Sequence, residues 1–207
     1  ADPFFAFVHI IDPHNWYLPP RPYDRLFLDP NVEYENLDQA RLVLSTADVP
    51  DNEIERELAI LNSLYDGEVA YADSQVGRLI AALDRLGIQD DTMVVVLADH
   101  GEHFYEKKKF LHGSGLYEPV VRIPLVVRYP AALQDHQPSV REEPVSLVDV
   151  FPTIAAVAGI ELDQEALELH GRSLMGLLTD HVVVAESDDN EFKAIRKDGL
   201  KLIVNRS

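Results

Sequence analysis

An apolar run that ends directly in a carboxylate and an imidazole constrains this chain more than any other feature. Residues 93–97 show no polar alternation and are rich in valine, a pattern typical of a strand buried on both faces of a sheet. Asp99, His100 and Gly101 follow after a single alanine. Because ligands of open α/β sheets bind just beyond the carboxyl ends of such strands, the sequence predicts a functional site at this turn.

The residue types at this turn point to a metal ion. A carboxylate and an imidazole are hard and borderline metal ligands, so Asp99 and His100 are the predicted ligands. Asp-His-Gly alone is a weak signal, since a turn after a strand is often only a turn. His103 and His112 lie in the following loop and strengthen the case for a site. The lysines at 107–109 are more typical of a solvated loop tip than of an anion site.

A second apolar run, FFAFVHII at residues 4–11, predicts another buried strand. Asp12 and His14 follow it, so an acid and a histidine again stand at the predicted carboxyl end of a strand. Residues 21–50 contain three prolines and show no periodicity. They predict a long surface excursion, which in compact domains is often functional.

A long amphipathic helix is predicted next. Apolar residues recur about every 3.6 positions from Ile54 to Leu86, which is the spacing of one helical face. Asp51 marks the predicted start of the helix and Gly87 its end. A coiled coil is the alternative for so long a helix. Because a buried strand follows at once, we expect the helix to pack on a sheet instead.

The remaining pattern completes an α/β fold with a mixed, largely parallel sheet flanked by helices and the start of a small C-terminal antiparallel sheet. We expect residues 1–180 to form part of the α/β domain and residues 181–207 to form strands of the small subdomain. The further elements predicted are a strand at residues 122–128, helices at residues 146–159 and 171–174, and short antiparallel strands at residues 181–186, 192–196 and 200–204.

Composition excludes several functional classes. The chain is acidic, with 36 Asp and Glu against 18 Lys and Arg and a formal net charge of −18. It therefore lacks the basic face that would release counterions from nucleic-acid phosphates. There is no cysteine, which excludes disulfides, thiolate metal sites and a cysteine nucleophile within these residues. No apolar run approaches about 20 residues, so no membrane span is predicted.

The order of these motifs resembles the C-terminal half of the sulfatases, within the alkaline phosphatase superfamily. The resemblance covers nearly the whole chain and implies an alkaline phosphatase-like fold. The resembling segments are, in order, FFAFVH with DPH and PP at residues 4–20, YDGEV at 65–69, TMVVVLADHGE at 92–102, HGSGLYE at 112–118, VRIPL at 121–125, VSLVD at 145–149 and GRSL at 171–174.

The resemblance implies a sulfuric-ester hydrolase that uses one divalent cation, calcium in most members. Asp99 and His100 match a late pair of metal ligands, and the cation would polarise the sulfate oxygens. His14 matches a histidine that contacts the sulfate ester. His112 matches a lysine or histidine near the leaving oxygen, where it would protonate or stabilise that oxygen. His103 is a possible additional site residue.

Two departures from the family pattern stand out. The family nucleophile is a formylglycine made within a C/S-x-P-x-R motif, and no such motif occurs in these 207 residues. The first pair of metal-binding acids also has no counterpart. We therefore expect a fragment whose partner is the missing N-terminal half of the same protein, and which alone is inactive and binds metal weakly. His100 in place of asparagine suits zinc or manganese better than calcium.

Two other functions remain open. One is a phosphoryl-transfer enzyme of the same superfamily, a phosphonate monoester hydrolase or a phosphoglycerol transferase. The other is a non-catalytic binding or scaffold domain. For the sulfatase, the expected substrate is a small-molecule or saccharide sulfate ester. Trp16, Tyr17 and Tyr23 are candidates for stacking on a sugar or aryl group, although packing within their loop is the favoured interpretation.

Overall fold

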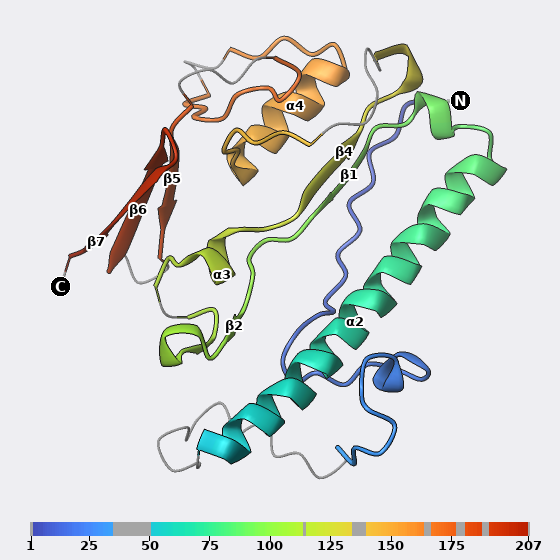
Figure 1. The fold of residues 1–207 in the computed structure, drawn as a ribbon. Helices are drawn as coiled ribbons and strands as arrows, with labels where there is room; N and C mark the ends of the chain where they lie inside the picture. The colour runs from blue at the N-terminus through green and yellow to red at the C-terminus, as the bar shows by residue number, and fades with distance from the viewer. Residues whose placement is uncertain are drawn as a thin grey trace. The chain divides into compact units, whose positions relative to one another are not determined.

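The computed structural model describes residues 2–34, 51–113, 115–133, 140–163, 167–176, 181–187 and 191–206 (Figure 1). The chain divides into two compact units. The first comprises Ala1–Leu86 and Phe104–Leu111, and the second comprises Gly87–His103 and His112–Ser207. The predicted division at residue 180 stays a prediction. Within the described residues, no helix is both long enough and apolar enough to cross a bilayer.

The first unit is built on α2 (Asp51–Arg85), a single continuous helix of 35 residues (Figure 1). Leu61 and Leu64 on its amino-terminal half are at most 2% exposed. Gly87 follows the helix with a φ of +66°, a left-handed conformation that favours glycine and ends helices. The predicted helix and its terminating glycine are therefore confirmed.

The core of the first unit forms where the loop before α2 packs on the helix. Tyr17 and Leu28 contact Ile60, Leu61 and Leu64 in one buried cluster. Full burial of each such side chain contributes about 1.5–3 kcal/mol, so this cluster anchors the loop. The expected packing of the helix on a sheet stays a prediction.

Residues 4–11 differ from their predicted state. They form no strand, and no strand pairs with them in the part of the chain that the structure describes. Phe5 and Phe7 are 75% and 80% exposed. The predicted buried strand is therefore wrong for this structure. An apolar run becomes a buried strand only when hydrogen-bonded neighbours cover it, and a sequence pattern does not supply those neighbours.

The second unit contains the predicted strand before the Asp99 turn. β1 (Val94–Leu97) pairs antiparallel with β4 (Leu125–Arg128), with Val95 opposite Val127. Both strands were predicted, and both are present. β1 is only half-buried, and Leu97 is 38% exposed, so burial on both faces is not observed. The described registers are all antiparallel, so the α/β class holds but its parallel character is not shown.

Two short elements follow the turn. β2 (His103–Phe104) and β3 (Phe110–Leu111) form a two-stranded sheet, so the chain between them reverses direction. α3 (Glu118–Val121) is a single helical turn with a proline near its start. These elements determine where the residues of the candidate site lie.

The predicted helix at residues 146–159 is present as a 3-10 turn, Leu147–Asp149, followed by α4 (Val150–Val157). Its first turn carries a reciprocal capping box between Ser146 and Asp149. Gly159, with a φ of +69°, lies beyond its end. The predicted helix at residues 171–174 is wrong: residues 171–173 have no regular secondary structure, and Leu174 begins a turn. A Cβ on Gly171 would lie 1.9 Å from the Val148 carbonyl oxygen, so glycine permits the close approach.

Asp149 joins three segments of the second unit. Its carboxylate is fully buried, with 0% exposure. Oδ2 accepts the Ser146 N–H at 2.8 Å, and Oδ1 accepts the Arg172 N–H at 2.8 Å. The ring Nε2 of His181 lies 3.1 Å from Oδ2. A buried carboxylate is stable only when its oxygens are satisfied in this way.

The C-terminal segment forms the small antiparallel sheet that the sequence predicted. β5 (Val183–Glu186), β6 (Phe192–Lys197) and β7 (Leu200–Asn205) lie in sequential order (Figure 1). Asp198 and Gly199, with φ values of 52° and 76°, form the turn between β6 and β7. Positive φ at both central residues matches the right-handed twist of a tight hairpin.

Replacing Asp149 tests the importance of its buried network. Asp149→Ala leaves two backbone N–H groups and His181 without their acceptor, and is expected to lower the free energy of unfolding by about 3 kcal/mol. Asp90→Ala, at an exposed position of the same unit, is the control and is expected to change it by less than about 0.5 kcal/mol. Urea denaturation of both variants measures the difference. Equal stabilities would contradict the network.

Candidate metal and ester-binding site

The turn after β1 is held against α3 by a close backbone contact. The Gly101 N–H donates to the Val120 carbonyl at 2.6 Å. A Cβ at position 101 would lie 2.0 Å from the Pro119 carbonyl oxygen, so only glycine fits there. This contact fixes the position of Asp99 and His100, which immediately precede the glycine.

Asp99 and His100 present their polar atoms close together. Asp99 Oδ1 lies 3.9 Å from His100 Nε2. The Asp99 side chain is 79% exposed and that of His100 is 39% exposed, so both are accessible. His100 Nδ1 lies 2.9 Å from the Gly101 carbonyl oxygen. Because a carbonyl can only accept a hydrogen bond, Nδ1 carries the proton and Nε2 of the neutral ring keeps its lone pair.

This arrangement fits a pair of metal ligands. Two bonds of about 2.0–2.4 Å from one cation can span a nitrogen and an oxygen 3.9 Å apart. Metal-binding histidines also typically donate their other ring N–H to a carbonyl or carboxylate, as His100 does here. Among the described residues, no group of three or more His, Asp or Glu side chains could hold a metal. Metal binding by the pair stays a prediction.

The short β2–β3 hairpin returns His112 to this turn. The His112 ring lies 4.0 Å from the His100 ring, between centroids, with a tilt of 32°. Its Nδ1 lies 3.1 Å from Glu102 Oε1, although the two residues are ten positions apart. The Glu102 side chain is only 9% exposed, whereas that of His112 is 35% exposed. The structure therefore brings His112 together with the predicted metal pair.

Sequence reasoning did not identify Glu102. Its place directly after Asp99-His100-Gly101 was the available signal, but the sequence alone does not show that the hairpin folds back on it. His103, the possible additional site residue, is 1% exposed and lies 6.2 Å from the Tyr117 ring. This is the environment of a packed residue, and its role in a site stays a prediction.

His14 belongs to the first unit, where Glu68 of α2 holds its loop. The His14 N–H donates to Glu68 Oε2 at 3.1 Å, and the Leu18 N–H donates to Oε1 at 2.6 Å. Glu68 is 2% exposed, and burial raises the pKa of its carboxyl group while the two backbone hydrogen bonds oppose that rise. Sequence reasoning assigned no role to Glu68. Contact of His14 with an ester stays a prediction.

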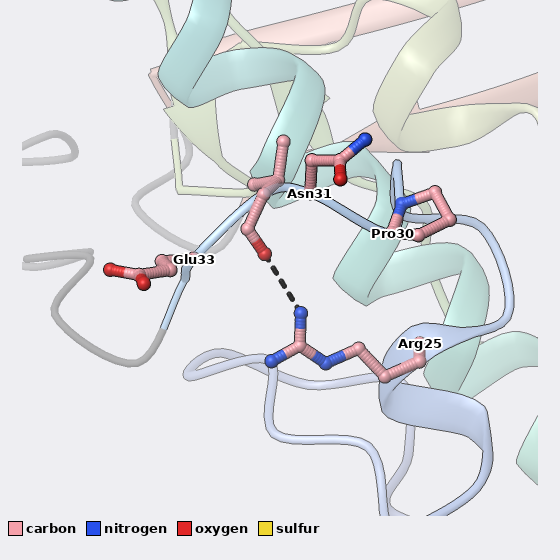
Figure 2. Close-up of a pocket in the computed structure, with 5 residues that line it drawn as sticks. Arg25, Pro30, Asn31 and Glu33 are labelled. Atoms are coloured by element: carbon pink, nitrogen blue, oxygen red, sulfur yellow. Dashed lines mark hydrogen bonds between the residues drawn. The ribbon is translucent and has the colours of Figure 1, made fainter.

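A hollow in the first unit contains none of the predicted site residues. It is lined by Arg25, at the end of a 3-10 helix, and by residues 30–33 of the loop that follows (Figure 2). The Arg25 guanidinium reaches across it and donates to the Val32 carbonyl at 2.8 Å (Figure 2). The guanidinium also lies 4.6 Å from the centre of the Tyr34 ring. These contacts stabilise the loop itself.

An ion-pair network joins α3 to the C-terminal sheet. Lys201 Nζ donates to Glu118 Oε1 at 2.8 Å, and Arg196 Nη1 donates to Oε2 at 3.0 Å. Arg196 and Lys201 are direct neighbours across β6 and β7. The Lys201 hydrogen bond, assisted by Arg196, lowers the pKa of the Glu118 carboxyl group below its usual value. The same helix that holds the Asp99 turn is therefore held by the sheet.

Comparison with known proteins identifies the family. The family model described as Sulfatase matches residues 1–160. The steryl-sulfatase of Rattus norvegicus is 37% identical over 140 residues, which cover 62% of this chain and 24% of the relative. The arylsulfatase K of Mus musculus is 35% identical over 140 residues, covering 67% of this chain and 23% of the relative. The chain thus spans about a quarter of the length of these relatives.

Solved structures show the same fold. The phosphonate monoester hydrolase from Silicibacter pomeroyi superposes with a TM-score of 0.64 at 21% identity, covering 94% of this chain and 48% of that chain. The class is therefore an α/β protein of the alkaline phosphatase-like fold. Within this class, the match over residues 1–160 shows that the chain belongs to the sulfatase family.

Substitution of Glu68 tests whether its carboxylate holds the loop that carries His14. Glu68→Ala removes the acceptor of two loop N–H groups and is expected to lower the free energy of unfolding by about 2 kcal/mol. Glu55→Ala, at an exposed position of the same helix, is the control and should change it by less than about 0.5 kcal/mol. Guanidinium denaturation of the two variants provides the comparison. A Glu68→Ala protein as stable as the control would show that the loop does not depend on this carboxylate.

The stability contributed by the Glu118 ion pairs should depend on pH. A carboxyl group whose pKa is lower in the folded state stabilises the protein above its unfolded pKa, and this stabilisation is lost as pH falls through the folded pKa. Because the Glu118 side chain is 44% exposed, Glu118→Gln should cost only about 1 kcal/mol at pH 7.

The difference in unfolding free energy between wild type and Glu118→Gln should shrink as pH falls below the unfolded value of 4.5. It should also shrink in high salt, since the pairs are partly exposed. Thermal melts across this pH range measure it. A difference that is constant with pH would mean that the carboxylate charge contributes nothing.

Proposed function

We propose that this chain is part of a sulfuric-ester hydrolase, in which Asp99 and His100 supply ligands for a divalent cation and His112 acts on the leaving oxygen. The observation that carries the proposal is the cluster at the β1 turn, where Asp99 Oδ1 and His100 Nε2 lie 3.9 Å apart and the His112 ring stacks on His100. Membership of the sulfatase family supports it.

In this proposal, the 207 residues contribute only part of the active site. The chain spans about a quarter of its curated relatives and contains neither cysteine nor a C/S-x-P-x-R motif. The formylglycine nucleophile and the remaining acidic metal ligands would come from an N-terminal half of the same protein. A pair of ligands binds a cation weakly, so these residues alone are expected to be inactive.

When bound, a divalent cation would polarise the sulfate oxygens as a Lewis acid. The hydrogen bond from His100 Nδ1 to the Gly101 carbonyl keeps Nε2 available as a ligand. Calcium is the ion expected from the family, whereas the imidazole favours manganese or zinc.

His112 and His14 have separate proposed roles. As the S–O bond breaks, negative charge develops on the leaving oxygen, and a proton from His112 neutralises it. His14 is exposed, and its Nδ1 lies 2.7 Å from the Asn15 carbonyl oxygen. A carbonyl in this position requires Nδ1 to carry the proton, which leaves Nε2 to contact the ester.

The proposed substrate is a small-molecule or saccharide sulfate ester. The named relatives, a steryl-sulfatase and an arylsulfatase, suggest esters of bulky hydrophobic or aryl alcohols. Tyr17 is buried and packs edge-to-face on Tyr65, and Tyr23 packs on Tyr71. Trp16, which is 43% exposed, is therefore the better candidate for stacking on the alcohol.

Phosphonate monoester hydrolysis is the second candidate function. It is favoured by the imidazole of His100, since an Asp-His pair suits the transition metals that phosphoryl-transfer enzymes use. The fold similarity to a phosphonate monoester hydrolase is compatible with either function.

The test uses the full-length protein that contains this chain. Hydrolysis of 4-nitrophenyl sulfate and of a 4-nitrophenyl phosphonate ester is measured after metal removal and reloading with calcium, manganese or zinc. We expect the sulfate ester to be preferred. Asp99→Ala and His112→Ala should each lower kcat/KM by about 100-fold or more, whereas Asp90→Ala should not.

Preference for the phosphonate would favour the second candidate. A full-length protein that lacks formylglycine by intact mass and hydrolyses neither ester would favour a binding or scaffold role.

A further inference from the structure

We propose that Glu102 is a positioning residue for His112: its carboxylate orients the imidazole ring and holds a proton on Nδ1, so that Nε2 is the nitrogen that serves the leaving oxygen. The inference rests on the proposed function, because it concerns how His112 serves the leaving oxygen. Glu102 is not one of the proposed metal ligands, so orienting His112 is its separate role in the site.

The geometry of the pair supports this role. Glu102 Oε1 lies 3.1 Å from His112 Nδ1, within hydrogen-bond distance. The carboxylate is 9% exposed, so water competes little for it, while the 35% exposed imidazole remains accessible. The opposing contact is the ring of His100, 4.0 Å away between centroids. The carboxylate and the neighbouring ring together restrict rotation of the imidazole.

The same contact determines the role of each ring nitrogen. An ionised carboxylate can only accept a hydrogen bond, so His112 Nδ1 must carry a proton. The nitrogen that exchanges a proton with the leaving oxygen is then Nε2. A ring that gives its Nε2 proton to the leaving oxygen keeps the Nδ1 proton bound to Glu102 and becomes neutral.

The hairpin has its own hydrogen bonds, so Glu102 is not needed merely to close it. The Tyr105 N–H donates to the Lys109 carbonyl at 2.8 Å, and the Lys109 N–H donates to the Glu106 carbonyl at 3.1 Å. The Glu106 carboxylate accepts the Phe104 N–H at 2.7 Å. Glu106 is therefore a matched control, a glutamate of the same hairpin that binds backbone instead of a histidine.

The experiment measures kcat and KM of the full-length protein on a series of aryl sulfates whose phenols differ in pKa. Glu102→Gln is the central variant because it is isosteric, yet its neutral amide no longer holds a proton on Nδ1 while Nε2 gives up its own. Glu102→Ala removes the partner altogether. Glu106→Gln is the control, and thermal melts confirm that each variant is folded at the assay temperature.

We expect both Glu102 variants to lower kcat by about 10- to 100-fold with a much smaller change in KM. The loss should grow as the phenol becomes a poorer leaving group, because such esters depend most on proton donation. In a His112→Ala background, Glu102→Ala should cause little further loss, since the two residues act as one unit. Glu106→Gln should leave the dependence on the leaving group unchanged.

Two results would overturn the inference while leaving the proposed function intact. One is a loss of the same size for every phenol, and the other is a full additional loss from Glu102→Ala when His112 is already absent. If the wild-type protein prefers phosphonate esters, the variants are compared on phosphonate esters of the same phenols, and the same two results overturn the inference. A wild-type protein that cleaves neither class would overturn both proposals.

Discussion

The close approach of the Asp99 turn to α3 is the constraint on which the candidate site depends. Gly101 lies so near the Pro119 carbonyl that no side chain fits, and its N–H is bound by the following residue of α3. α3 is held in turn by Glu118, through cationic side chains of two adjacent C-terminal strands. The small sheet therefore stabilises a turn that is distant from it in sequence, and loss of either contact would release Asp99 and His100.

Acidic side chains bind other segments in the described part of this strongly acidic chain. Glu68 and Asp149 accept backbone N–H groups, Glu102 contacts an imidazole, and Glu118 binds two cations. The first three are almost buried, and each has at least one partner ten or more positions away in the sequence. Carboxylates thus act as the connectors between loops in a chain that has no disulfide available.

Sequence reasoning succeeded where one local signal determines the structure. The helix over residues 51–85 follows from a sustained 3.6-residue period and a terminating glycine, and the β6–β7 hairpin follows from Asp198-Gly199. Sequence reasoning failed for residues 4–11, because an apolar run is buried as a strand only when neighbouring strands cover it, and the run does not specify those strands. The predicted largely parallel direction is not shown, because a local apolar run does not specify the direction of its partner strand. The Glu102–His112 contact required the hairpin to be known first.

The exposed apolar segment at residues 4–11 has a consequence for the colloidal behaviour of the chain. It presents aromatic and β-branched side chains to solvent, carries no acidic or basic residue other than one histidine, and pairs with no described strand. Such segments are templates for intermolecular strand addition and precipitation. The formal charge of −18 opposes association by mutual repulsion, and that repulsion weakens in high salt and near the isoelectric point of about 4.6. Solutions of this 207-residue chain should therefore stay clear at neutral pH and low ionic strength. They should become turbid when the salt concentration is raised or the pH is lowered toward the isoelectric point.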